Sequence, residues 1–166
     1  MPSWVLLSVL AWLGQAPINQ SGTLQIGPPV HAAAWKLSAS TSSEAGHSIT
    51  TTADLSQSDI AFAGVMIRCT REKATLAVVA ITPFAPKAQV QVTVKAKTES
   101  RYVGSVSPGG AAVELPDAAL NEAIATWPAQ GKISLLLETD RERIRGVVDV
   151  AGFASAYENL RSACSR

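Results

Sequence analysis

Alternating apolar and polar residues recur in short stretches along most of the chain after residue 34. The clearest stretch is 89–97, QVQVTVKAK, where Val90, Val92 and Val94 fall on one face of an extended strand and polar residues on the other. Residues 62–70, FAGVMIRCT, alternate in the same way. The other predicted strands are 35–40, 49–55, 74–82, 101–106, 111–115, 132–139 and 144–150.

Apolar residues at helical spacing are confined to two short segments. In 117–127 they share one helical face, and Asp117 is placed to cap this helix. A second helix is predicted near the chain end by a stripe of four residues: Phe153, Tyr157, Leu160 and Cys164. Because consecutive strands are joined by short turns, the sequence predicts a mainly β fold. We expect an antiparallel β-sandwich or barrel with a short inserted helix and a docked C-terminal helix.

The first part of the chain has a different pattern. Residues 4–13 are an apolar run with the length of a signal-peptide core, and Gly14-Gln15-Ala16 supplies small residues for cleavage. We therefore predict a signal peptide over 1–16, an irregular Pro- and Gly-containing arm over 17–34, and a single β-rich domain over 35–166. The alternatives are a buried core helix or strand at 4–13, and a later cut after Ala34.

Charge excludes some classes of partner. The chain of 166 residues has 14 Lys and Arg against 13 Asp and Glu, so it has no electrostatic footprint for nucleic acid. No basic stretch indicates an anionic membrane surface. The apolar run at 4–13 is too short to span a bilayer as a helix, so we expect no stable membrane span in the mature chain.

The chain has only two cysteines, Cys69 and Cys164. Cys69 shares a predicted strand face with Val65 and Ile67, and Cys164 lies on the apolar stripe of the C-terminal helix. We predict that both point inward and form a disulfide in an oxidising compartment, which docks the helix on the sheet. The alternative is a pair of free, buried thiols in a cytosolic protein.

No pattern in the sequence indicates catalysis. The only histidines are His31, in the arm, and His47, in a predicted turn over 44–48. Metal-ligand spacings, nucleophile elbows and Gly-rich phosphate loops are missing from the sequence. We therefore predict no catalytic, cofactor-binding or metal-binding residues and no cofactor. The charged turn ETDRER, 138–143, is expected to be solvated, with a partner contact as the alternative.

The roles of four further residues allow more than one interpretation. Arg68 is expected on an exposed sheet face, with anion binding or a carboxylate pair as the alternatives. Asp149 is expected to point outward if Val148 and Val150 point inward. Two tryptophans are expected to be core anchors: Trp35 and Trp127.

Four elements, in order, carry a resemblance to a known family. They are Trp35 in WKLS, the strand VMIRCT, the apolar strand TLAVVAI, and the ending DVAGFASAYENLRSAC. Over about 35–164 the chain resembles small exported proteins of Gram-negative bacteria, in particular the periplasmic accessory family associated with type VI secretion. The resemblance implies a periplasmic or secreted location and supplies no catalytic residues.

Together these observations predict an exported, non-catalytic binding or accessory protein of the bacterial envelope, with a protein partner there and a link to a secretion apparatus. The first alternative is a stand-alone secreted or periplasmic protein that binds a host or cell-wall component. The second alternative is an enzyme of unknown type.

Overall fold

The computed structural model describes residues 35–39, 46–70 and 73–165, all of which belong to the unit His31–Arg166. The predicted signal peptide and arm, 1–16 and 17–34, lie outside the described residues. The strands are β1 (Trp35–Ala39), β2 (Gly46–Thr52), β3 (Phe62–Thr70), β4 (Lys73–Ala80), β5 (Gln89–Lys95), β6 (Glu99–Val106), β7 (Ala112–Glu114), β8 (Lys132–Glu138) and β9 (Arg143–Asp149). The helices are α1 (Asp117–Thr126), the single 3-10 turn η1 (Trp127–Ala129) and α2 (Phe153–Cys164).

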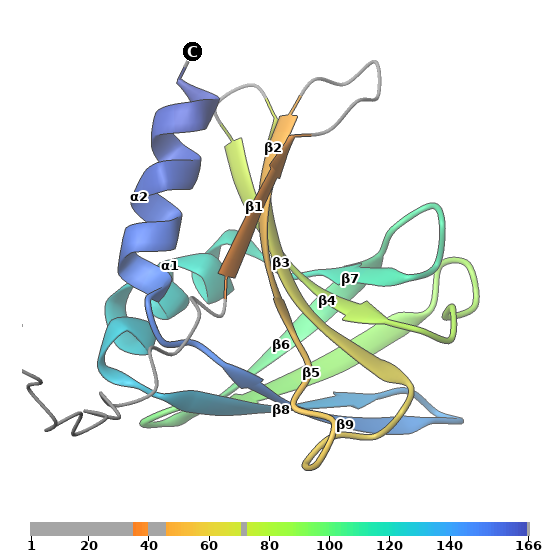
Figure 1. Cartoon of the computed structure of the whole chain (residues 1–166). Helices are drawn as coiled ribbons and strands as arrows, with labels where there is room; N and C mark the ends of the chain where they lie inside the picture. The colour runs from red at the N-terminus through yellow and green to blue at the C-terminus, as the bar shows by residue number, and fades with distance from the viewer. Residues whose placement is uncertain (1–34, 40–45, 71–72, 166) are drawn as a thin grey trace, which may run out of the picture. The chain divides into compact units, whose positions relative to one another are not determined.

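All nine strands belong to one antiparallel sheet in the order β1-β2-β3-β4-β7-β6-β5-β8-β9. The sheet curls, so that β8 and β9 pass beneath β2 and β3 at a steep angle (Figure 1). The predicted mainly β fold with an inserted helix and a C-terminal helix docked by a disulfide is therefore confirmed.

Side chains help the curled sheet to close on itself. β9 meets the segment that follows β2 through a bridge between Val148 and Ala53. Further along, the Val147 N–H donates to Ser58 Oγ at 2.9 Å, and the Arg145 N–H donates to Asp59 Oδ2 at 2.7 Å. These oxygens take the place of strand carbonyls, so the edge of β9 is satisfied without another strand.

Residue size at one glycine also shapes this closure. A Cβ on Gly146 of β9 would collide with the ring of Phe62, which is fully buried at the start of β3. Because residue 146 has no side chain, the Phe62 ring can pack against its backbone inside the curled sheet.

Alternation along the strands explains the core. Val90, Val92 and Val94 of β5 are all buried, as their spacing predicts. Thr93, between them, is 6% exposed although it points to the opposite face, where its cross-strand neighbours are Arg101 of β6 and Leu136 of β8. Period-two patterning therefore identified the inner face correctly but not every buried position.

Helix α2 covers the inner face of β1, β2 and β3 beside an aromatic cluster. The Phe153 ring lies 5.4 Å from the Trp35 ring, 5.2 Å from the Trp127 ring and 5.9 Å from the Tyr157 ring. Phe153 is 1% exposed and both tryptophans are buried. The predicted apolar stripe of α2 and the two predicted core tryptophans are confirmed.

Helix α1 is held at its side as well as by its core face. Glu122 of α1 accepts hydrogen bonds from Ser100 Oγ at 2.6 Å and from the Tyr102 hydroxyl, both on β6. Partial burial, and then the hydrogen bond to Glu122, raise the pKa of Tyr102 to about 12. The expected cap at Asp117 is wrong: Pro116 is the N-cap residue and Asp117 is the first residue of the helix.

Candidate functional site

The Cys69–Cys164 disulfide joins β3 to the last residue of α2, with the two Cα atoms 6.3 Å apart. Cys69 is 3% exposed on the inner sheet face, beside Ile67 and Val65, as the strand pattern predicts. Cys164 lies at the C-terminal end of a helix, where the helix dipole disfavours a thiolate. This placement suits a permanent cross-link more than thiol exchange.

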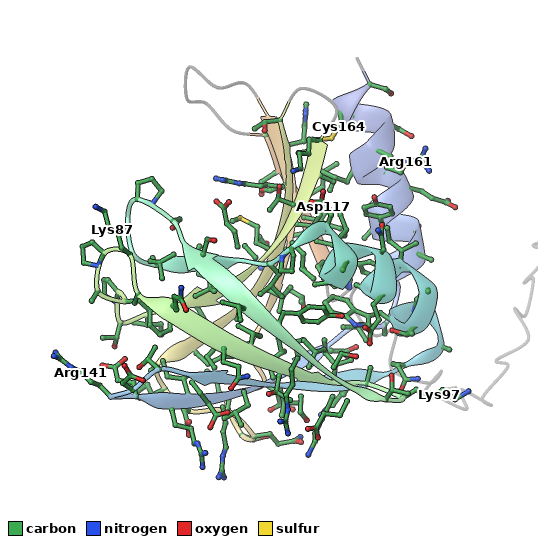
Figure 2. All side chains as sticks on the ribbon, turned by 180° about the vertical axis from the view of Figure 1, so that it is seen from behind. Lys87, Lys97, Asp117, Arg141, Arg161 and Cys164 are labelled. Atoms are coloured by element: carbon green, nitrogen blue, oxygen red, sulfur yellow. A yellow bond between two sulfur atoms is a disulfide. The ribbon has the colours of Figure 1, made fainter. Side chains whose placement is uncertain are left out.

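Beside the disulfide lies a groove of about 840 Å³. Its walls come from α2, the first residues of α1 and the start of β4, and Figure 2 labels Asp117, Arg161 and Cys164 around it. The less polar part of its lining consists of the two half-cystines with Ala74, Leu120 and Leu160. The volume lies in the range of ligand pockets, whereas the lining is more polar than that of most such pockets.

Charged side chains of both signs line the rest of the groove. Lys73 Nζ lies 3.4 Å from Asp117 Oδ1, and both side chains are well exposed. Glu158 and Arg161 of α2 also line the groove and are exposed, and Asn121 of α1 adds a polar amide. Two acids and two bases therefore line the groove, and its described residues carry no net charge.

Tyr157 connects this groove to the aromatic cluster. Its ring is stacked on Phe153 at an interplanar angle of 16°, and one side of it lines the groove. A partly buried ring fixed in this way can offer a flat apolar surface to a ligand without much loss of side-chain entropy.

Comparison with known proteins gives one distant likeness. No family model and no curated protein matches the chain. Invasion associated protein B from Bartonella henselae is a solved structure to which the chain is similar. It has a TM-score of 0.49 and 12% identity, over 81% of this chain and 96% of that one.

The structure shows where Arg68 and Asp149, both singled out in the sequence, point and what they contact. Arg68 is exposed and forms an ion pair with Glu114 of β7. Asp149 turns away from the core while Val148 and Val150 are fully buried, and its carboxylate accepts the Ala151 N–H at 2.7 Å. Asp149 therefore helps to form the turn into α2, as an outward-pointing residue can.

The expected turn at 44–48 is wrong in its described part. His47 lies in β2 and pairs with Cys69 of β3, so it is a strand residue close to the disulfide. β2 contains the β-branched run that follows His47 and begins before that run, at Gly46. His31 lies outside the described residues. Within the described ranges, no cluster of three or more His, Cys, Asp or Glu side chains could hold a metal ion.

Two other charged clusters lie outside the groove. In the ETDRER turn, Arg143 pairs with Glu138 across the β8–β9 hairpin. Near the end of β2, Asp54 accepts hydrogen bonds from Lys132 at 2.7 Å and from Ser56 Oγ at 2.6 Å. The Lys132 ammonium first, and then Ser56, lower the pKa of Asp54 to about 2. Both clusters are at the solvent, where ion pairs contribute little to stability.

The groove was not predicted from the sequence, although Cys69 and Cys164 were. Its other lining residues come from three elements that are distant in the chain: Lys73, Ala74, Asp117, Leu120, Asn121, Tyr157, Glu158, Leu160, Arg161, Ser162 and Ser165. No local motif joins them. The only available indication was a charged residue at the start of an element, such as Lys73 in β4 and Asp117 in α1.

Proposed function

We propose that this protein is an exported, non-catalytic binding protein of the bacterial envelope. The disulfide supports the compartment, because such bonds form and persist in oxidising environments such as the periplasm. The apolar run at 4–13, with small residues after it, supports export. In the described part of the chain, no helix is both long and apolar enough to cross a membrane.

The single observation that carries the binding role is the groove beside the disulfide. It combines less polar lining residues, a fixed aromatic ring and charges of both signs. The disulfide lies directly in its wall, so the cross-link that docks α2 also fixes the distance between α2 and β3 there. A preformed groove of this kind binds a partner at low ordering cost.

The narrower role of an accessory to a type VI secretion apparatus rests on the resemblance of the four sequence elements. The alternative is a stand-alone periplasmic or secreted protein that binds a host or cell-wall component. These roles differ in where the protein is found: an accessory stays with envelope complexes, whereas a stand-alone secreted protein is recovered from the culture medium.

In-cell crosslinking tests the binding role. A photo-crosslinking amino acid is introduced at Asn121, which is exposed in the groove, and at Ser105, which is exposed on β6 outside it. Crosslinked species are then identified by mass spectrometry in periplasmic, membrane and medium fractions. We expect a discrete envelope protein to be captured from position 121 only. Equal capture from both positions, or recovery of the chain from the cytosol with reduced thiols, would contradict the proposal.

A further inference from the structure

Strand β4 has an open edge beside the groove. Over its whole length β4 pairs with β3, but its pairing with β7 covers only Ala77 to Val79. One more bond follows, from the Leu115 N–H to the Leu76 carbonyl at 2.8 Å. Beyond that point the chain turns at Pro116 into α1, so β7 does not reach the first residues of β4.

Alternation decides which backbone groups face this open side. The Leu76 carbonyl and the Ala80 N–H both bond toward the β7 side. Because N–H and C=O groups of every second residue point to the same side of an antiparallel strand, both backbone groups of Ala74 point there too. Among the described residues, no backbone group is paired with them.

The groove lies where the next residues of β7 would have been, because Ala74 itself lines it. A strand placed there would continue the β7 ladder and form hydrogen bonds with the N–H and C=O of Ala74, which no described backbone group pairs with. Its side chains on one face would lie over Leu120 and Cys164, which also line the groove. The other face would point to solvent.

The charges fit a polypeptide better than a polyanion. Among the described lining residues, Lys73 and Arg161 are balanced by Asp117 and Glu158, whereas nucleic acid or a phosphate-rich polymer requires an excess of cations. Backbone dipoles and mixed side chains of an extended peptide can use charges of both signs.

We propose that the groove binds an extended segment of a partner protein, which adds as a strand to the open edge of β4 at Ala74. This inference rests on the proposed binding function and names the class of partner for the same groove. Backbone hydrogen bonds supply part of the affinity in this mode, and the pocket selects side chains at alternate positions of the segment.

The first experiment selects a peptide ligand and measures hydrogen exchange at the open edge of β4. Random twelve-residue peptides displayed on phage are selected on the purified, disulfide-bonded full chain, and an enriched peptide is synthesised. Amide hydrogen exchange of the chain is then followed by NMR with and without this peptide. We expect exchange at Ala74 to slow at least tenfold, while Val78, already within the β7 ladder, changes little.

The second experiment uses matched variants. Ala74→Pro removes the N–H on the open side and leaves the pairing of its neighbours with β3 intact, whereas Ala74→Val keeps the N–H. We expect at least a tenfold loss of peptide affinity for the proline variant and less than a threefold change for the valine variant. If the proline variant does not fold, the exchange result on the unmodified chain decides.

Three outcomes would overturn strand addition: no enriched peptide, binding without slower exchange at Ala74, or enrichment of phosphate-rich polymers or glycans over peptides in a parallel binding assay. Its failure is distinct from failure of the binding function. If Asn121 crosslinks to an envelope protein while Ala74 exchange is unchanged, binding stands and strand addition fails. If a second copy of the chain is captured instead, the partner-protein assignment is wrong.

Discussion

Phe153→Ala is predicted to be the most damaging single substitution in α2. The Phe153 ring is 1% exposed and lies between the rings of Trp35, Trp127 and Tyr157 at 5.2–5.9 Å. Truncating a buried Phe to Ala costs about 3–5 kcal/mol, since both transfer free energy and packing around the new cavity are lost. That is a large share of the roughly 5–15 kcal/mol that stabilises a typical domain.

The assay is equilibrium unfolding in urea, followed by tryptophan fluorescence and far-UV circular dichroism. Fluorescence is informative because Trp35 and Trp127 both contact the deleted ring. A loss of 3–5 kcal/mol corresponds to a melting temperature lower by about 10–20 °C for a domain of this size. Phe153→Leu, which keeps most of the volume, should lose less than half as much.

Ser155→Ala is the matched control, because Ser155 is exposed on the same helix. We expect it to change the free energy of unfolding by less than about 0.5 kcal/mol. The reasoning is refuted if Phe153→Ala loses less than about 1 kcal/mol with an unchanged dependence on urea, since the aromatic cluster would then not hold α2 on the sheet.

Other predictions follow from separate features. Gly146→Ala should destabilise the fold by about 1–3 kcal/mol by overpacking, whereas Gly131→Ala, with open space around its Cβ, should not; thermal unfolding of the pair checks this. Cys164→Ser should lower the free energy of unfolding by up to about 4–5 kcal/mol, measured against the reduced wild type as a control, which should lose a similar amount. Asp54 has a pKa lowered from 3.8 to about 2, so the ionised carboxylate stabilises the fold above pH 4, and this stabilisation is lost as the pH falls toward 2. The difference in free energy of unfolding between the wild type and Asp54→Asn should therefore shrink over that range, and a constant difference contradicts this. Tyr102→Phe should remove the phenolate absorbance step near pH 12, and a step that persists there belongs to another group.

Residue periodicity made the core and the disulfide predictable. Alternation in 62–70 placed Cys69 on the inner face, and the stripe through Phe153 and Leu160 placed Cys164 on the helix face that covers it. Each inference depended only on which side of one element a residue lies. That information is local, and it is present in the spacing of apolar residues.

Contacts between distant elements were not predictable in this way. Ser58 and Asp59 close the sheet onto β9 at sequence separations of 89 and 86, and neither residue belongs to a strand. The groove likewise depends on the position of β7 between β4 and β6, because its early end leaves Ala74 uncovered. Strand order is set by the energy of the whole sheet, and no single segment encodes it.

The Cys69–Cys164 bond also has a mechanical consequence. It turns the 95-position span from β3 to the end of α2 into a covalent ring. A force applied to the two chain ends can straighten only what lies outside this ring, so about 330 Å of contour length stays hidden until the bond is reduced. In a pore that admits only a single extended strand, the chain would stop at the ring. Passage through such a pore must therefore precede oxidation.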